Sequence, residues 1–411
     1  MKKIQFSEWG ISSPLYWGLL AFLAAVAGVG GLAALYMEHH GHWVTGMSNQ
    51  VVWGTPHVFA VFLIVAASGA LNVASIGSVF GKKLYKPLAP LSGLLAVALL
   101  LGGLMVLVLD LGRPDRLVIA MTHYNFKSIF AWNILLYTGF MAIVLVYLFT
   151  MMERKMNLFS KPVGTFAFVW RLILTTGTGS IFGFLVAREG YNSALLAPMF
   201  IVMSFVFGTA IYILVLMYAF RADSRPLGDV VLFRLKSLLG IFIAGMLYFT
   251  LVFHLTNLYI TENHEFEAFV LRDGGIYTAA FWLGHMLVGG LIPLFIVYHP
   301  VLGQSRQWIA GACALAIVGG LATMYLVIIG GQAFPMSLFP GKTVIESGFY
   351  DGVNGSAAAY APSIPEFLLG LGGVAVALLL TVVGIRMLRF LPASLADEVA
   401  DPHGGKTAAA H

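Results

Sequence analysis

Apolar residues along this chain gather into ten long runs separated by short polar segments. An α-helix of ~20 apolar residues is long enough to cross the hydrocarbon core of a bilayer. The pattern is typical of an all-α polytopic membrane protein, with an integral membrane domain over residues 1–390 and a polar, flexible segment over 391–411. The predicted transmembrane helices lie near residues 15–36, 54–79, 88–109, 128–150, 166–187, 194–220, 238–259, 279–298, 308–329 and 364–386.

Composition excludes several classes of protein. Of the 411 residues, 59% are hydrophobic and 10% are charged, a balance that leaves too little polar surface for a soluble domain. The single cysteine, Cys313, excludes a disulfide framework, a zinc ribbon and a cysteine-ligated iron–sulfur cluster contributed by this chain alone. The sequence has no glycine-rich phosphate loop of the Walker type, which excludes an ATP-driven pump.

The distribution of basic residues predicts the orientation in the membrane. The first apolar run is too long for a cleaved signal peptide and is interpreted as a signal-anchor. Sixteen of the 23 Lys and Arg residues lie at the termini and in alternate loops, against six in the other loops and Arg171 inside a helix. Because basic loops stay in the cytoplasm, both termini are expected there. The segments around residues 38–42, 110–116 and 330–363 then face the outer side.

The ionisable residues of the predicted helices lie close to that outer side. His57, His254 and His285 are each expected roughly 5–10 Å below the outer boundary, at ~1.5 Å of rise per residue. Asp110 ends the third helix and Glu366 begins the tenth, on the same side. Polar groups are costly in hydrocarbon, which makes these residues functional candidates, and imidazole with carboxylate can relay protons.

Structural roles stay open for the same groups. A buried histidine can simply hydrogen-bond between helices, and Asp110 can pair with Arg113. Arg171 can snorkel to the cytoplasmic interface, or it can belong to a proton path with the hydroxyls that follow it (Thr175, Thr176, Thr178 and Ser180). A haem deep in the membrane is not expected, because no helix carries two suitably spaced histidines. A single b-type haem near the outer face remains an open alternative.

Six short stretches, in this order, resemble the NrfD/PsrC family of integral membrane subunits over nearly the whole chain. The length matches the longer, ten-helix branch, which includes the membrane subunits of alternative complex III. Asp-Leu-Gly-Arg-Pro after a transmembrane helix is the most specific of the six. The stretches are Trp53-Gly54-Thr55-Pro56-His57, Asp110-Leu111-Gly112-Arg113-Pro114, Ser128 with Trp132-Asn133, Phe281-Trp282-Leu283-Gly284-His285, Gly330-Gly331-Gln332 and Pro362 to Glu366.

The resemblance implies two four-helix bundles, formed by helices 2–5 and 6–9, with helices 1 and 10 at the periphery. It implies a multi-pass subunit of the bacterial inner membrane that has no redox cofactor of its own and binds a quinone, menaquinone or ubiquinone, near the outer face. Electrons would be exchanged with a periplasmic ferredoxin-like iron–sulfur subunit. Further subunits of the complex would be a multihaem cytochrome c or a catalytic reductase.

The resemblance also implies roles for particular residues. His57 falls where the family has a quinone-contacting histidine, and Asp110 falls in the family's shared loop, so these two are the expected catalytic pair. The outer surface with Arg113, Arg116 and residues 330–363 is expected to dock the iron–sulfur subunit. The expected quinone lining on the fourth helix is Trp132, Asn133 and Tyr137, and the candidates for the second bundle or a proton path are Arg171, His254, His285 and Glu366.

Two other functions compete with a quinone-reactive subunit. A secondary transporter would place its polar site near the bilayer midplane, whereas the polar residues here are shallow. A structural anchor for a periplasmic subunit would explain the outer loops but not the buried histidines. Bound quinone and iron–sulfur signals in the purified complex would distinguish the three.

Overall fold

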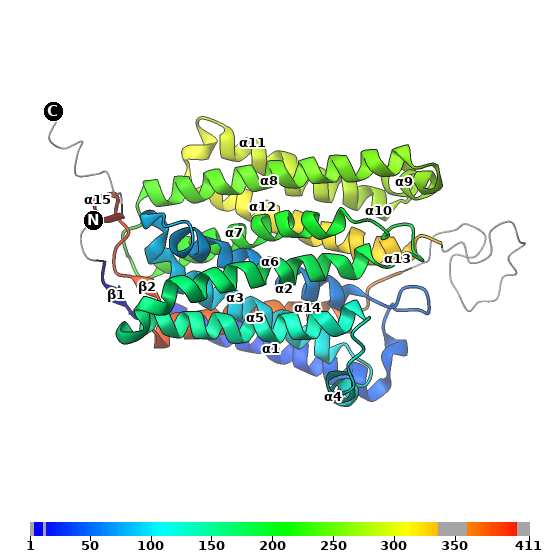
Figure 1. Ribbon diagram of the computed structural model, residues 1–411, viewed down its shortest axis with the longest axis horizontal. Coiled ribbons are helices and arrows are strands. Elements are labelled where there is room, and N and C mark those ends of the chain that lie inside the picture. Colours follow the sequence, from blue (N-terminus) through cyan, green and yellow to red (C-terminus); the bar gives the residue numbers. More distant parts are fainter. Residues whose placement is uncertain (1–3, 11–13, 336–359, 401–411) are drawn as a thin grey trace, which may run out of the picture.

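The computed structural model describes residues 4–10, 14–335 and 360–400, and nearly all of its regular structure is helical. Long helices run side by side along the longest axis of the molecule (Figure 1). They are α1 (Pro14–His40), α2 (Thr55–Ser78), α3 (Ala89–Leu109), α5 (Ile129–Met152), α6 (Ser160–Gly183), α7 (Leu196–Ala222), α8 (Asp229–Tyr259), α12 (Arg306–Tyr325) and α14 (Ile364–Met387).

Short elements join these helices or interrupt them. A further membrane-length segment consists of α10 (Ile276–Ala279), a π-helical stretch (Ala280–Leu291) and α11 (Ile292–Tyr298). A second π-helical stretch (Leu326–Gly330) joins α12 to α13 (Gly331–Ala333). The other α-helices are α4 (Leu117–Thr122), α9 (His264–Ala268) and α15 (Asp397–Ala400), and the strands are β1 (Phe6–Ser7) and β2 (Leu391–Pro392). A third π-helical stretch (Phe269–Asp273) follows α9, and short 3-10 helices lie in several connecting segments.

Nine helical segments of the described residues are long and apolar enough to cross a membrane, which agrees with an all-α polytopic membrane protein. The nine overlap nine of the ten predicted segments. The remaining predicted segment, 166–187, overlaps α6, which is 24 residues long but is not among the nine. Its polar first turn, its hydroxyl-bearing residues and Arg171 lower its hydropathy.

The two ends of the helical assembly differ in what they carry. β1 pairs antiparallel with β2, Phe6 opposite Pro392, so the beginning and the end of the described chain meet (Figure 1). We call this the termini end, and the other end, where α4, α9 and α13 lie, the opposite end. Residues 391–400 contribute the buried side chains of Leu391, Leu395 and Ala400, while the rest of the expected flexible segment, 401–411, lies outside the described residues.

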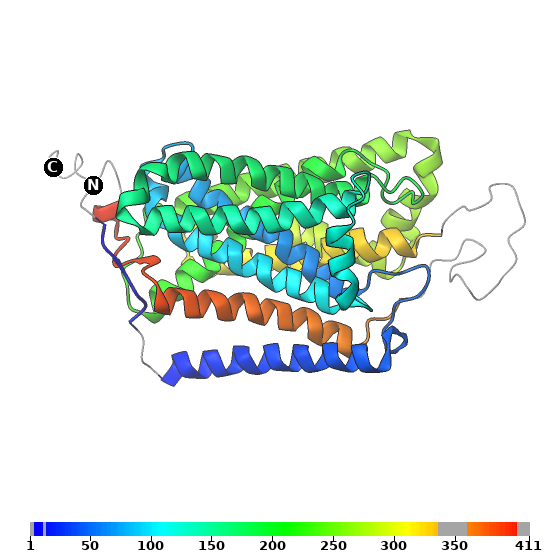
Figure 2. The same cartoon turned by 60° about the horizontal axis from the view of Figure 1, so that its bottom comes forward.

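The long helices form two groups that share a central contact. The first group is α2, α3, α5 and α6, and the second is α7, α8, α12 and the segment from α10 to α11. α2 packs extensively against α7 and is the most buried span, with 94% of its most apolar window inside the protein. α14 packs on α2 and α3, and α1 packs mainly on α14, so α1 lies outermost (Figure 2).

Several boundaries differ from the sequence prediction. α8 begins at Asp229 rather than near residue 238, because its amphipathic first turns bury Val231, Leu232 and Leu235. α6 covers 160–183 instead of 166–187. The predicted helix at 279–298 contains the π-helical stretch that carries His285, and π-helical turns occur frequently at functional sites.

Candidate functional site

His57 and Asp110 meet at the opposite end of the first group. Pro56 sits in the first turn of α2, where its missing N–H costs no hydrogen bond, and His57 follows it. Asp110 ends α3, and its backbone N–H donates to the carbonyl of Val106. The Nδ1 atom of His57 lies 2.8 Å from Oδ2 of Asp110, so the alternative in which Asp110 pairs with Arg113 does not hold. Arg113 instead lies 3.6 Å from Asp115, on the surface.

The Asp110 carboxylate is buried, but its oxygen atoms receive no hydrogen bonds from the described residues. Its side chain is 0% exposed, whereas that of His57 is 16% exposed. The close Nδ1–Oδ2 contact is not aligned as a hydrogen bond, and neither carboxylate oxygen has a hydrogen-bond partner among the described residues. Buried polar atoms are nearly always hydrogen-bonded in native proteins. The two oxygens are therefore available to a donor on a bound molecule.

An open cavity of about 610 Å³ gives access to this pair. Its lining includes His57, Asp110, Trp53 and, from the segment after α1, His42. The Nε2 atom of His42 is buried and also has no partner among the described residues. The histidines that follow the first predicted helix are visible in the sequence, but nothing there indicates that one of them lines the same cavity as Asp110. Sequence reasoning therefore missed His42.

Trp53 covers the imidazole of His57, and the second group holds Trp53 in place. The two rings stack with centroids 6.2 Å apart. Gln332, which is 1% exposed, accepts hydrogen bonds at Oε1 from the N–H groups of Val52 and Trp53 and donates from Nε2 to the Trp53 carbonyl. The amide of one side chain thus fixes the segment that leads into α2. In the sequence Gln332 stood out only as part of a motif.

Arg188 and Gln50 complete the connection around Gln332. The guanidinium of Arg188 donates to the backbone carbonyls of Gln332 and Gln50, at 2.9 and 2.7 Å. Gln50 is buried and directs its Nε2 at the carbonyls of residues 332–334. These bonds join the segment before α2 to the end of the second group, so the site is built from both groups.

Glu366 holds the same entrance segment from the other side. It is 0% exposed, and its Oε2 accepts from the N–H groups of Gly46 and Ser363 at 2.8 and 2.7 Å. Tyr360 donates to Oε1 of Glu366 and accepts from the N–H of Thr55, two residues before His57. Burial raises the pKa of the Tyr360 hydroxyl, which keeps the proton that this bond needs. Glu366 is placed to position the start of α2.

The three residues expected from the fourth predicted helix lie elsewhere. Trp132 is 45% exposed and donates from its indole N–H to the carbonyl of Phe126. Asn133 donates to the carbonyl of Gly177 on α6, and the hydroxyl of Tyr137 lies 3.2 Å from that of Thr178. None of the three lines the cavity that contains His57. Their contact with a bound molecule stays a prediction.

Arg171 does not snorkel to the interface. Its side chain is 0% exposed and donates to the Asn72 side chain at 2.9 Å and to the Ser68 carbonyl at 3.3 Å. The guanidinium lies 4.9 and 5.0 Å from the ring centroids of Phe168 and Phe205. Cation–π contacts and neutral acceptors thus replace water around the charge. Arg171 lies along α6 away from the end that carries His57, and it is not among the described residues that line the cavity of His57.

The second group contains a separate polar cluster. The Nδ1 atom of His254 lies 2.7 Å from Oε2 of Glu267, which is fully buried. His285 contacts the hydroxyls of Thr250 and Thr323, at 2.8 and 2.6 Å. Both histidines line a cavity of about 40 Å³, which is large enough for water. Glu267 was not predicted from the sequence, because it lies in a short polar stretch between two predicted spans.

The surface expected to dock a partner is described only in part. Arg113 and Arg116 are exposed at the opposite end, near α4. In the expected loop 330–363, residues 336–359 lie outside the described residues.

Comparison with known proteins gives a consistent set of similarities. The sequence model of a family described as polysulphide reductase, NrfD, matches residues 43–336. The chain is 31% identical over 404 residues to the Hdr-like menaquinol oxidoreductase integral membrane subunit of Archaeoglobus fulgidus, covering 97% of this chain and 99% of that protein. It is 24% identical over 313 residues to protein NrfD of Escherichia coli, covering 69% and 96%.

A third relative is named for the reduction of menaquinone rather than for the oxidation of menaquinol. The chain is 23% identical over 348 residues to the integral membrane subunit of menaquinone reductase from Nitratidesulfovibrio vulgaris, covering 78% of this chain and 82% of that protein. The family match begins after α1 and ends before α14, so these two helices flank the shared region.

Proposed function

Because the chain belongs to the NrfD family of integral membrane subunits of multi-subunit oxidoreductases, we propose that it is the quinone-reactive subunit of a respiratory complex. The observation that carries the proposal is the His57–Asp110 pair, whose buried carboxylate lacks a hydrogen-bond donor among the described residues and faces an open cavity. Relatives named for menaquinol oxidation and menaquinone reduction support menaquinone as the quinone. The same pair serves either direction of electron flow.

The pair supplies what quinol oxidation requires at the protein side. A quinol hydroxyl donates a hydrogen bond to an unpartnered oxygen of Asp110 or to Nε2 of His57, since Nδ1 of His57 faces the carboxylate. Two electrons pass to the iron–sulfur partner proposed below, and two protons are released in succession. Imidazole backed by a carboxylate accepts each proton in turn and stabilises the resulting charge. The partly exposed His57 then passes it to water in the cavity. In quinone reduction the same steps run in reverse.

We propose ten membrane spans, with α6 as the tenth, arranged as two four-helix bundles that correspond to the first and second groups. Because α6 packs against α5, α2 and α7, protein rather than lipid surrounds Arg171, Thr175, Thr178 and Ser180. The pairing of β1 with β2 supports both termini on one side of the membrane. The excess of basic residues at that end makes it the cytoplasmic side and places His57 near the periplasm.

This topology predicts the outcome of reporter fusions. A fluorescent protein fused after His411 should be active in the cytoplasm, and alkaline phosphatase inserted after Arg116 should be active in the periplasm. The reason is that residue 116 lies at the opposite end of the helices from the β1–β2 pair. Alkaline phosphatase activity at the C-terminus and none at residue 116 would refute the orientation.

The electron partner is proposed to be a periplasmic ferredoxin-like iron–sulfur subunit docked over Arg113 and Arg116. Both arginines are exposed beside the cavity that leads to His57, which keeps the distance for electron transfer short. The proposal is tested on the complex purified from membranes. Bound quinone, iron–sulfur signals and quinol oxidation with an artificial acceptor are expected together, whereas a transporter or an anchor would give assembly without quinone turnover.

Gln332 provides a test of how Trp53 and His57 are positioned. In Gln332→Leu the N–H groups of Val52 and Trp53 lose their acceptor, and leaving a buried donor unpaired costs about 1–3 kcal/mol. We expect turnover with quinol to fall about tenfold or more in a complex that still assembles. Tryptophan fluorescence should report the displaced Trp53 ring.

The matched control is Gln307→Leu, an exposed glutamine at the other end of the same helical segment. It should leave turnover and fluorescence unchanged. If both substitutions had the same effect, the bonds from Gln332 would not position the site.

A further inference from the structure

A large open cavity lies at the termini end, far from His57. Its volume is about 1160 Å³, and the ends of five long helices surround it: α2, α3, α5, α6 and α14. All five end there together, so the cavity opens at the level where lipid headgroups meet a membrane protein. Nothing in the proposed quinone chemistry uses this cavity.

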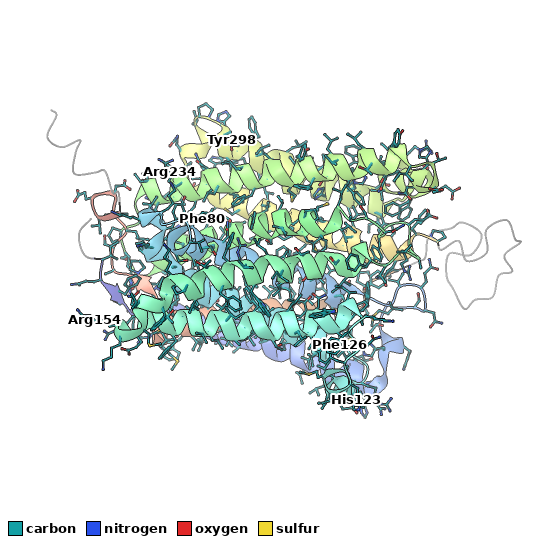
Figure 3. All side chains as sticks on the ribbon, in the orientation of Figure 1. Phe80, His123, Phe126, Arg154, Arg234 and Tyr298 are labelled. Atoms are coloured by element: carbon teal, nitrogen blue, oxygen red, sulfur yellow. The ribbon has the colours of Figure 1, made fainter. Side chains whose placement is uncertain are left out.

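Cations from four separate segments converge on the cavity. Lys86 precedes α3, Arg154 follows α5, Lys161 lies in the first turn of α6, and Arg389 follows α14. Figure 3 shows Arg154 extending from this end of the molecule. Among the described lining residues Glu8 is the single carboxylate, 3.5 Å from Arg389. The other three cations have no acidic partner within the described chain, so the cavity attracts anions.

The same cavity also has apolar walls and one unused hydroxyl. Met151, Met387 and Leu388 line it beside the cations. Tyr147 contributes a buried hydroxyl that lies near the side chain of Ser78, another lining residue, but is not aligned with a hydrogen-bond partner among the described residues. A ligand that suits this lining combines a phosphate with less polar parts, because a bare inorganic anion would leave the apolar walls unused.

An adjoining groove extends from this cavity along the outer face of α6. It has a volume of about 490 Å³ and shares Lys161 with the cavity. Pro162, Phe166 and Val169 continue it, at a helical spacing that places them on one face. Phe166 and Val169 are 53% and 47% exposed, as expected for side chains that contact hydrocarbon. The groove therefore fits an acyl chain that runs down from the cavity.

From these observations we propose that the cavity binds the headgroup of an anionic phospholipid, with an acyl chain along α6. The phosphate contacts Lys86, Arg154 and Lys161, the hydroxyl of Tyr147 donates to a headgroup oxygen, and the apolar walls hold the glycerol end of the chains. Basic pockets between transmembrane helices on the cytoplasmic side commonly bind such lipids. Free phosphate has the same charge but no part that would occupy the groove.

The test is lipid retention by the full chain in detergent, measured by native mass spectrometry. The protein is stripped of lipid and then supplied with phosphatidylglycerol, phosphatidylcholine or inorganic phosphate. The triple variant Lys86→Ser, Arg154→Ser, Lys161→Ser removes the three unpaired cations. The control triple Lys82→Ser, Lys83→Ser, Lys155→Ser removes the same charge from exposed lysines at the same end, outside the cavity.

The unmodified chain and the control triple should retain one phosphatidylglycerol molecule. The fraction of the cavity triple that retains this lipid should be lower by about tenfold or more. Glu8→Gln, which removes the carboxylate of the cavity, should increase retention and keeps the test informative if the cavity triple does not fold. Equal retention by the two triples would overturn the proposal. So would equal retention of phosphatidylcholine, or binding of inorganic phosphate that prevents lipid binding at millimolar concentration.

Discussion

In the assembled complex, His57→Ala should lower quinone-linked turnover by about 100-fold or more, the usual contribution of a positioned general acid or base. The imidazole is the partly exposed member of the pair with Asp110. Without it, His42 is the one ionisable side chain left beside the buried carboxylate among the described residues that line the cavity. Folding should persist, since His57 lies in the first turn of α2 and removing its ring enlarges an already open cavity. Quinol oxidation by the purified complex, with assembly checked by gel filtration, measures the effect.

The control is His123→Ala, an exposed histidine at the same end of the molecule and outside the cavity (Figure 3). It should leave turnover unchanged. Normal kinetics in an assembled His57→Ala complex would refute the assignment of the site to the first group. His254 and His285, which share the small cavity of the second group, would then be the residues to test.

Asp110→Asn should reduce the maximal turnover rate by about tenfold or more while leaving assembly intact. Asparagine has nearly the shape of aspartate but no charge, so the protonated form of His57 loses its buried counter-ion. Proton acceptance from the quinol then becomes the slow step, and a solvent isotope effect on the rate should appear or increase. Steady-state kinetics in H₂O and D₂O measure both quantities.

Asp115→Asn is the matched control, because Asp115 lies in the same loop but is exposed and pairs with Arg113. It should have wild-type kinetics. If it slowed turnover as much as Asp110→Asn, the loop itself and not the buried carboxylate would be responsible.

The sequence predicts the spans well, because hydropathy reports directly on the length of apolar helix. It also predicts depth, which is why His57 and Asp110 were expected at one level, and they do meet. Hydropathy misplaces helix ends, as with α6, which covers 160–183 rather than 166–187, and as at the start of α8, where an amphipathic turn extends the helix. In both cases packing with neighbouring helices decides the outcome.

Depth does not determine the direction in which a side chain points. Trp132, Asn133 and Tyr137 were expected beside His57 because they begin the fourth span on the same side, yet Asn133 and Tyr137 contact α6. His42 and Glu267 lie in short connecting segments, whose path over the helix ends depends on tertiary contacts. Arg171 was expected at the interface, and only the structure shows the amide, carbonyl and ring contacts that keep it inside.

The bonds from Gln332 to Val52 and Trp53 also bear on the order in which the protein is made. Residues 52 and 53 leave the ribosome some 280 residues before Gln332, a separation that the bonds must span. The first four spans can enter the membrane while the segment before α2 still lacks its partners. Glu366, the second clamp on this segment, is synthesised later still. The protein therefore becomes able to react with quinol only when its synthesis is nearly complete. Chains truncated before residue 332 should insert into the membrane but should not react with quinone or quinol.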